Sequence, residues 1–263
     1  MIKRPLAPFG TEISGLDLAA VTPPLFAELA LLIARSRVVV FRGQTLDDAA
    51  FVTFLRGLGP LTFTEGEKPV PNAPDLNIVS NVGRVTPPRS VFHTDTSYVT
   101  HPPAFTALRP VVLPATGGNT LFTDQVNAAA RLPAAAWRFL TGQTVLHQTS
   151  GLAGQCEATR QPLLRRVVAT GETALYLSTP ERCTQLSGVD ELTSQRIIAA
   201  LYRHSTKASR LYRHEWQSDD ILIWHNCVTM HKADHGHGGL TQDRVLHRGM
   251  VRGEACIKAT QSR

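Results

Sequence analysis

The chain has 263 residues, of which 43% are hydrophobic and 18% charged, and a formal net charge of +6. This length can bury one large core, and neither a linker nor an internal repeat separates two parts, so we predict a single domain over residues 1–263. The basic residues are scattered, without a Lys/Arg-rich run or an interleaved aromatic platform. This distribution argues against nucleic acid as a partner.

Membrane and disulfide classes are also disfavoured. The chain carries no apolar run long enough to cross a bilayer, and prolines and charges interrupt the N-terminal residues. Four widely spaced cysteines without a CxxC pair indicate neither a disulfide framework nor a thiolate zinc site. We therefore expect a cytoplasmic protein with no membrane partner. The sequence does not fix the oligomeric state, and a homo-oligomer is compatible with it.

The first part of the chain alternates helices and strands. Apolar residues at helical spacing predict a helix over residues 23–36, and a second helix over 46–58. Between them, the apolar run 38–41 predicts a buried strand. Residues 62–92 are rich in proline, glycine and charge, with one strand-like piece at 76–79. This stretch is a candidate lid.

Short strand-like runs separated by turns follow from residue 105 onward. Two helices interrupt them, at 134–140 and 191–204, the second with Asp190 as its N-cap. This pattern predicts a mainly β fold with flanking helices, built as a β-sandwich or jelly roll. The predicted strands are 105–113, 120–122, 143–148, 166–168, 174–178, 211–216, 221–224 and 244–251.

Three residues stand out as candidate metal ligands. His93 and Asp95 form a His-x-Asp tripeptide, and His231 follows far downstream. Two imidazoles and one carboxylate can hold one face of a mononuclear non-haem Fe(II) ion and leave the opposite positions open. On an extended strand the i, i+2 spacing would point the first two side chains to the same side. The tripeptide alone is short enough to occur by chance, and it also fits a surface turn.

Two arginines give this pattern a second component. Arg244 and Arg248 lie on one face of the last predicted strand, because strand side chains repeat every two residues. Buried guanidinium groups need anions to pair with. A dicarboxylate cosubstrate such as 2-oxoglutarate would supply them.

On these residues the chain resembles the taurine dioxygenase and 2,4-dichlorophenoxyacetate dioxygenase (TauD/TfdA) family of Fe(II)/2-oxoglutarate-dependent oxygenases. Further matching motifs, in the family's order, extend the resemblance over most of the chain. They are residues 15–18 (GLDL), 38–44 (VVVFRGQ), 58–61 (LGPL), 102–103 (PP), 113–121 (LPATGGNTL), 174–177 (ALYL) and 224–226 (WHN).

The resemblance implies a double-stranded β-helix, which is a jelly roll, with iron at one open end. It makes His93, Asp95 and His231 the Fe(II) ligands of an oxidoreductase that uses O2 and 2-oxoglutarate and releases succinate and CO2. Related halogenases replace the carboxylate ligand by a small residue. Because Asp95 is retained, we expect hydroxylation, or hydroxylation followed by loss of a heteroatom group.

The resemblance also assigns the cosubstrate residues. Arg244 would bind the distal carboxylate of 2-oxoglutarate, with Thr120 as its hydroxyl partner. Arg248 would act at the catalytic centre, close to both cosubstrate and substrate. A planar guanidinium suits two-point recognition of a carboxylate, which fits these roles.

Three positions bear on the substrate. The family position whose histidine holds the taurine sulfonate falls at Thr64, which argues against taurine. Arg89 lies near the substrate pocket in the family and would meet a carboxylate, sulfate or phosphonate, although an exposed lid arginine explains it equally well. Phe92 would form an apolar wall. We therefore expect a small, anionic organic substrate.

Two other classes of function remain open from the residues alone. His231, His235 and His237 could form a zinc site of a hydrolase, since imidazole is the commonest metal ligand. The glycine-rich continuation favours a loop for the last two histidines instead. A non-catalytic β-sandwich binding protein would need neither iron nor cosubstrate.

Overall fold

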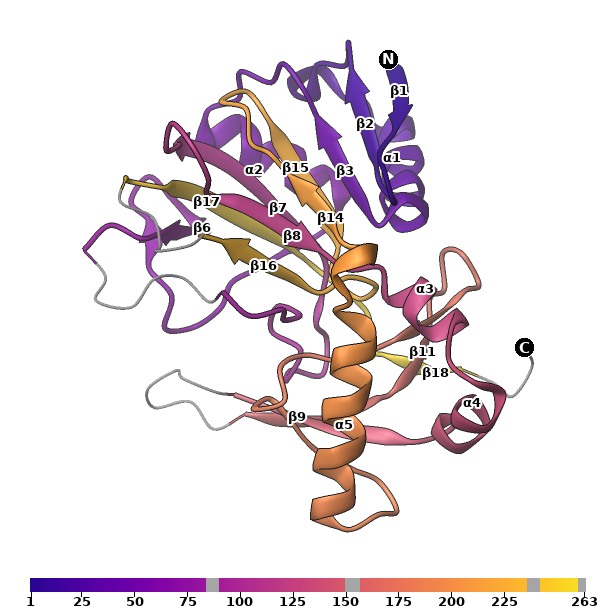
Figure 1. The fold of residues 1–263 in the computed structure, drawn as a ribbon. Coiled ribbons are helices and arrows are strands. Elements are labelled where there is room, and N and C mark those ends of the chain that lie inside the picture. The colour runs from indigo at the N-terminus through magenta and orange to yellow at the C-terminus, as the bar shows by residue number, and fades with distance from the viewer. Residues whose placement is uncertain (84–89, 150–156, 236–241, 260–263) are drawn as a thin grey trace.

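A computed structural model describes residues 1–83, 90–149, 157–235 and 242–259 (Figure 1). Its helices are α1 (Pro23–Ser36), α2 (Asp48–Leu58), α3 (Gln125–Ala130), α4 (Ala134–Leu140) and α5 (Glu191–Ser205), with the 3-10 turns η1 (Leu18–Ala20) and η2 (Ala208–Arg210). The strands of its large sheet are β1 (Ile2–Pro5), β2 (Thr11–Ser14), β3 (Val38–Phe41), β4 (Leu61–Thr62), β5 (Pro69–Val70), β6 (Ala73–Ser80), β7 (Pro103–Val112), β15 (Ile221–His225) and β17 (Val245–Arg252). The smaller sheets contain β8 (Asn119–Phe122), β14 (Tyr212–His214) and β16 (His231–Asp234); β9 (Thr144–Gln148), β10 (Ala158–Pro162) and β13 (Cys183–Leu186); and β11 (Leu164–Arg166), β12 (Thr173–Leu175) and β18 (Ile257–Lys258).

The large sheet has nine strands in the order β1-β2-β3-β15-β7-β17-β6-β5, with β4 paired to β17. The small sheet β14-β8-β16 lies over one of its faces (Figure 1). Apart from the parallel pair β2 and β3, neighbouring strands of the large sheet run antiparallel. The result is a mainly β jelly roll with flanking helices, as the sequence predicts.

The strand β3 shows how the sequence fills both faces of the large sheet. Val38 and Val40 point into a core shared with Phe122 of the small sheet. Val39 and Phe41 point the other way, into a core shared with α1 and α2. Because strand side chains alternate between faces, a strand buried on both sides reads as an unbroken apolar run.

The two N-terminal helices cover the outer face of the large sheet. Helix α1 has the predicted bounds Pro23–Ser36. Helix α2 begins at Asp48, two residues later than predicted, because the side chain of Asp47 accepts a hydrogen bond from Ala50 N at 2.8 Å and caps the helix. The remaining helices α3, α4 and α5 pack with β9 to β13 around a second apolar core (Figure 1).

The C-terminal half follows the predicted pattern with local shifts. Helix α4 has the predicted bounds, and Asp190 caps α5 through Thr193 N, as expected. The strand predicted at 166–168 instead ends at Arg166, because Val167 begins a turn that Gly171 N closes onto its carbonyl. Helix α3 and the hairpin of β1 and β2 were not predicted.

Part of the predicted lid, residues 62–92, belongs to the large sheet. Its strand at 76–79 is part of the longer β6, which pairs with β17 inside the large sheet. Residues 84–89 lie outside the described residues. The lid therefore remains a prediction for the segments between these strands.

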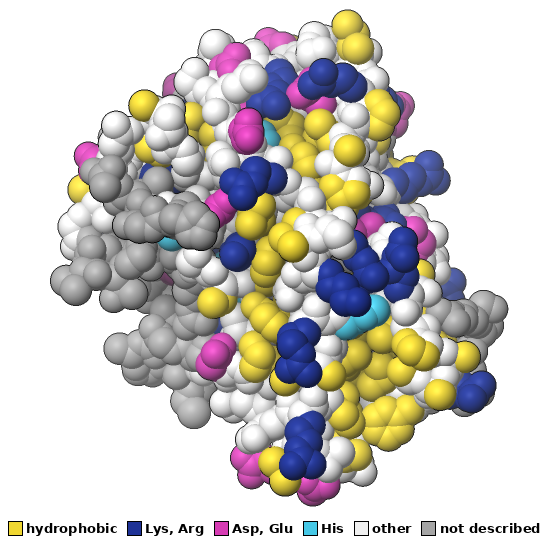
Figure 2. All heavy atoms as spheres, in the orientation of Figure 1, with side chains coloured by type: hydrophobic (Ala, Val, Ile, Leu, Met, Phe, Trp, Pro, Cys, Tyr) yellow, Lys and Arg dark blue, Asp and Glu magenta, His cyan; other side chains and the backbone are white. Residues whose placement is uncertain are grey.

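The surface and the helices add two findings. On the face shown in Figure 2, Lys and Arg side chains are interspersed with Asp and Glu side chains over the sheets and helices. In the part of the chain that the structure describes, no helix has both the length and the apolar character needed to cross a bilayer.

The packing of α2 on β17 predicts a position that tolerates no side chain. A Cβ added at Gly249 would collide with Leu55 Cδ1 and lie 3.0 Å from Leu76 Cδ2, and both leucines are fully buried. We expect Gly249→Ala to lower the free energy of unfolding by about 1–3 kcal/mol through overpacking. Urea denaturation measures this, with Thr53→Ala on the exposed side of α2 as the control. Equal stability of the two variants would contradict the packing.

Candidate metal centre

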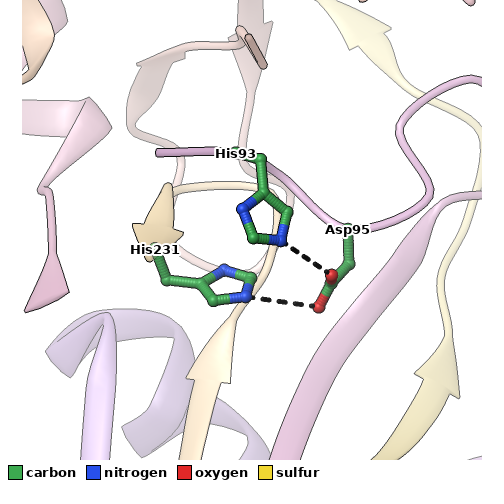
Figure 3. Close-up of side chains that lie close together, drawn as sticks. All are labelled: His93, Asp95 and His231. Carbon is green, nitrogen blue, oxygen red and sulfur yellow. Dashed lines mark ion pairs between the residues drawn. The ribbon is translucent and has the colours of Figure 1, made fainter. Parts of the chain in front are cut away.

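His93, Asp95 and His231 meet in one cluster, in which Asp95 and His231 are buried and His93 is partly exposed (Figure 3). His93 Nε2 lies 3.5 Å from Asp95 Oδ1, and His231 Nε2 lies 3.8 Å from Asp95 Oδ2. Two ligand atoms bound about 2.1 Å from one ion lie about 3.0 Å apart at right angles and at most about 4.2 Å apart. The three side chains can therefore share an ion with little movement. Among the described residues, no other group of three or more His, Cys, Asp or Glu side chains has metal-binding geometry.

The backbone brings the two histidines together by a single bridge. His93 N donates to His231 O at 3.0 Å, and His231 N donates to His93 O at 2.9 Å. The expected extended strand through residues 93–95 is wrong, because the chain turns at Asp95. Thr96 has a φ of 44°, a conformation that costs a β-branched residue about 1–3 kcal/mol. This conformational cost falls on the residue that follows the candidate ligand Asp95.

Side chains from other elements hold this turn in place. Asp95 N donates to Asn226 Oδ1 at 3.0 Å, and Asn226 Nδ2 donates back to Asp95 O at 3.0 Å. The Thr94 hydroxyl donates to Leu177 O at 2.7 Å, and Thr94 N donates to Ser178 Oγ at 3.2 Å. The sequence contains Asn226 in a family motif, but spacing alone gave no sign that it clamps Asp95.

The environment prepares both imidazoles for a metal. His93 Nδ1 lies 3.0 Å from Val91 O, and since a carbonyl only accepts, Nδ1 is the donor of this contact and Nε2 is the nitrogen that faces Asp95. His231 packs against Trp224, with ring centroids 4.5 Å apart. Burial lowers the pKa of His231 to about 3, although Asp95 opposes that shift. The imidazole is therefore neutral near pH 7, as metal ligation requires.

The carboxyl group of Asp95 is only 3% exposed. Burial alone would raise its pKa, but the attraction of neighbouring groups, among them the permanently charged Arg248 guanidinium, outweighs burial and holds that pKa well below its usual range. Arg248 Nη1 donates to Asp95 Oδ1 at 3.2 Å. The site thus contains an ionised carboxylate at neutral pH.

Arg244 lies next to this centre in a different environment. It is 2% exposed, its Nε donates to Gly118 O at 2.7 Å, and its Nη2 donates to Thr120 Oγ1 at 3.3 Å. Within the described residues no carboxylate forms an ion pair with it, and burial lowers its pKa to about 10. Trp216 Nε1 donates to the same Thr120 oxygen at 3.1 Å, a contact that the sequence did not predict.

Strand β17 places Arg248 and His247 on opposite faces. Arg248 reaches Asp95, and its second nitrogen Nη2 lies 3.8 Å from Glu67 Oε1. His247 points away from Arg248, and its Nδ1 lies 2.7 Å from Asp48 Oδ1 on helix α2. Strand alternation therefore directs the guanidinium groups toward the triad and the imidazole toward the outer helix.

Two of the expected substrate residues can be placed. Thr64 is buried, and its Oγ1 lies 3.1 Å from Thr96 Oγ1, directly after Asp95. Phe92 packs in the second apolar core, with Lys232 Nζ 5.1 Å from its ring centroid. Because Lys232 alternates with His231 along β16, this ring lies on the side of the strand away from the triad. Its role as an apolar wall of the substrate pocket stays a prediction.

The remaining candidate residues are Arg89, His235 and His237. Arg89 and His237 lie outside the described residues. His235 is buried but does not belong to the metal-competent group. The alternative zinc cluster of His231, His235 and His237 therefore has no support from the described part of the chain.

The contribution of Asn226 to the position of Asp95 can be tested by mutation. Asn226→Ala removes both hydrogen bonds to the Asp95 backbone, so we expect about 10- to 100-fold weaker metal binding. Calorimetric titration with Mn(II) measures the affinity, after circular dichroism has shown a folded protein. Asn127→Ala, at an exposed site on α3, is the matched control. Unchanged Mn(II) affinity in Asn226→Ala would show that these two hydrogen bonds do not position Asp95 for the metal.

Comparisons with known proteins agree with this geometry. The chain is 27% identical to an alpha-ketoglutarate-dependent sulfate ester dioxygenase of Pseudomonas putida, over 94% of this chain and 88% of that protein. It is 25% identical to an alpha-ketoglutarate-dependent 2,4-dichlorophenoxyacetate dioxygenase of Cupriavidus pinatubonensis, over 89% and 92% of the two chains. A taurine dioxygenase structure from Burkholderia xenovorans has a TM-score of 0.86 at 28% identity, over 98% of this chain and 92% of that one. The family model described as "Taurine catabolism dioxygenase TauD, TfdA family" matches residues 3–250, and the chain belongs to that family.

Proposed function

We propose that this chain is an Fe(II)- and 2-oxoglutarate-dependent dioxygenase that hydroxylates a small anionic organic substrate and releases succinate and CO2. The observation that carries the proposal is the buried Arg244, which has no carboxylate partner among the described residues and lies four residues before Arg248, which contacts Asp95 of the triad. A buried guanidinium without an anion is costly. The distal carboxylate of 2-oxoglutarate would remove that cost.

Each residue of the triad would have a distinct part in holding iron. His93 would present its Nε2 atom, His231 a neutral imidazole, and Asp95 a carboxylate that Arg248 helps to keep ionised. When bound, iron would supply the O2-dependent oxidation of a substrate C–H bond with 2-oxoglutarate as the second electron source. The protein would position the reactants and keep competing groups away.

Thr120 would contribute a directed proton to cosubstrate binding. Its Oγ1 already accepts hydrogen bonds from Arg244 Nη2 and Trp216 Nε1. A hydroxyl has two lone pairs and one O–H, and both lone pairs of Thr120 are in use. Its O–H is therefore left to donate to a further acceptor. A carboxylate at Arg244 would receive that donor together with the guanidinium fork, which favours an anion over a neutral group at this end of the site.

The substrate class follows from relatives and from Thr64. The similar proteins are named for a sulfate ester and for 2,4-dichlorophenoxyacetate, and a further one, from Saccharomyces cerevisiae, for a sulfonate. All three substrate classes are small organic anions. We propose a substrate of this kind, other than taurine because Thr64 stands where the family's sulfonate-binding histidine is expected. Hydroxylation next to a heteroatom would release that group.

The triad provides the direct test of the proposed reaction. We expect His93→Ala, Asp95→Ala and His231→Ala each to lower Fe(II)-dependent succinate formation by at least about 100-fold, since two remaining ligands hold iron poorly. Succinate is measured with added Fe(II), 2-oxoglutarate and ascorbate in a screen of small organic anions, and bound iron by metal analysis. His101→Ala, at an exposed position, is the control. A triad variant with full activity would exclude its residue as a ligand.

Arg244 tests cosubstrate recognition separately. Losing a charge-assisted pair in a buried site costs about 2–5 kcal/mol, so Arg244→Ala should weaken 2-oxoglutarate binding by tens- to thousands-fold. Calorimetry with Mn(II)-loaded protein measures this without turnover. Arg213→Ala, which removes a half-exposed guanidinium paired with Asp234, is the control. An unchanged dissociation constant in Arg244→Ala would move the cosubstrate carboxylate to another residue, with Arg248 next.

A further inference from the structure

Arg248 has a second carboxylate neighbour whose role the metal site does not explain. Its Nη2 lies 3.8 Å from Glu67 Oε1, whereas its Nη1 donates to Asp95 Oδ1 at 3.2 Å. The Arg248 side chain is 11% exposed, the Asp95 side chain 4% and the Glu67 side chain 26%. Asp95 is therefore the fixed partner, and Glu67 is the looser, more hydrated one.

The polypeptide holds Glu67 beside the site from both directions. Glu67 N donates to Thr64 O at 3.2 Å and closes a turn whose Thr64 hydroxyl contacts Thr96. Before the turn, β4 pairs with Met250 and Val251 of β17. After the turn, Ile78 N donates to Lys68 O at 2.8 Å. The backbone of Glu67 is thus anchored, while its side chain can leave Arg248 by rotation alone.

The charges of the site give this carboxylate a consequence. With Fe(II) and dianionic 2-oxoglutarate bound, the charges of the iron, the cosubstrate, Asp95, Arg244 and Arg248 would add up to +1. The negative charge of Glu67 would cancel this remainder. An anionic substrate would then enter a site with no net attraction, as long as Glu67 faces Arg248. If the anionic group of the substrate takes the place of Glu67 on the Arg248 guanidinium, the substrate regains the attraction of that positive charge.

We propose that Glu67 is a displaceable counter-ion of Arg248, which lowers the affinity of the site for anions and admits those whose anionic group can take its place on the guanidinium. This inference rests on the proposed function. It makes Glu67 a specificity-determining residue. Anions that approach without reaching Arg248 gain nothing, because the guanidinium stays paired with Glu67.

The test is the affinity of Mn(II)-loaded protein for 2-oxoglutarate, which the resemblance places close to Arg248. Glu67→Gln keeps the shape of the side chain and removes its charge. We expect about 3- to 30-fold tighter binding of 2-oxoglutarate by calorimetry, because the competing carboxylate is gone. Equal or weaker binding in Glu67→Gln would overturn the proposal.

Two matched variants separate this contact from a general change in charge. Glu65→Gln removes the same charge from the same turn at an exposed position, and its affinity should stay within about twofold of wild type. In an Arg248→Gln background, Glu67→Gln should give no gain, since the pair is already broken. A gain of the same size in Glu65→Gln, or one that persists without Arg248, would also overturn the proposal.

The same titrations distinguish this inference from the proposed function. Failure of the wild-type Mn(II) protein to bind 2-oxoglutarate would defeat the proposed function and the counter-ion role together. Normal binding that depends on Arg244, combined with no response to Glu67→Gln, would defeat only the counter-ion role.

Discussion

The buried carboxylate of Asp95 is the constraint on which the site depends. An ionised group that is only 3% exposed needs positive charge close by, and Arg248 supplies one such charge at 3.2 Å. His93 and His231, together with Asp95, can hold a cation that supplies another. The backbone bridge between the histidines and the Asn226 clamp on Asp95 fix this arrangement before any metal binds.

The jelly roll explains why these residues meet although they are far apart in sequence. His231 opens β16 on the small sheet, whereas Arg248 lies on β17 of the large sheet, and the core between the two sheets closes the space beneath them. Arg244 and Thr120 lie deeper, where burial strengthens recognition of a carboxylate. Glu67 lies at the more hydrated side and can respond to the ligand. The site thus combines a rigid metal face with one adaptable ion pair.

The sequence predicts most of this fold because its strongest patterns are local. Four consecutive buried residues identify β3, and helical spacing identifies α1 with the observed bounds. Residue chemistry and the family resemblance together predict His93, Asp95 and His231 as the candidate metal ligands. The turn at Thr96, the clamp by Asn226 and the contact of Glu67 with Arg248 were not predictable, because each depends on contacts between segments distant in sequence.

The proposed function requires one iron and one 2-oxoglutarate to bind together at this triad. Anaerobic addition of 2-oxoglutarate to the Fe(II) protein, followed by visible absorption, measures this joint binding, because chelation of Fe(II) by the keto acid produces a charge-transfer band. We expect a band that saturates at one iron and one 2-oxoglutarate per chain and is absent in Asp95→Ala. A missing band in the wild-type protein, or an equal band in Asp95→Ala, would contradict it.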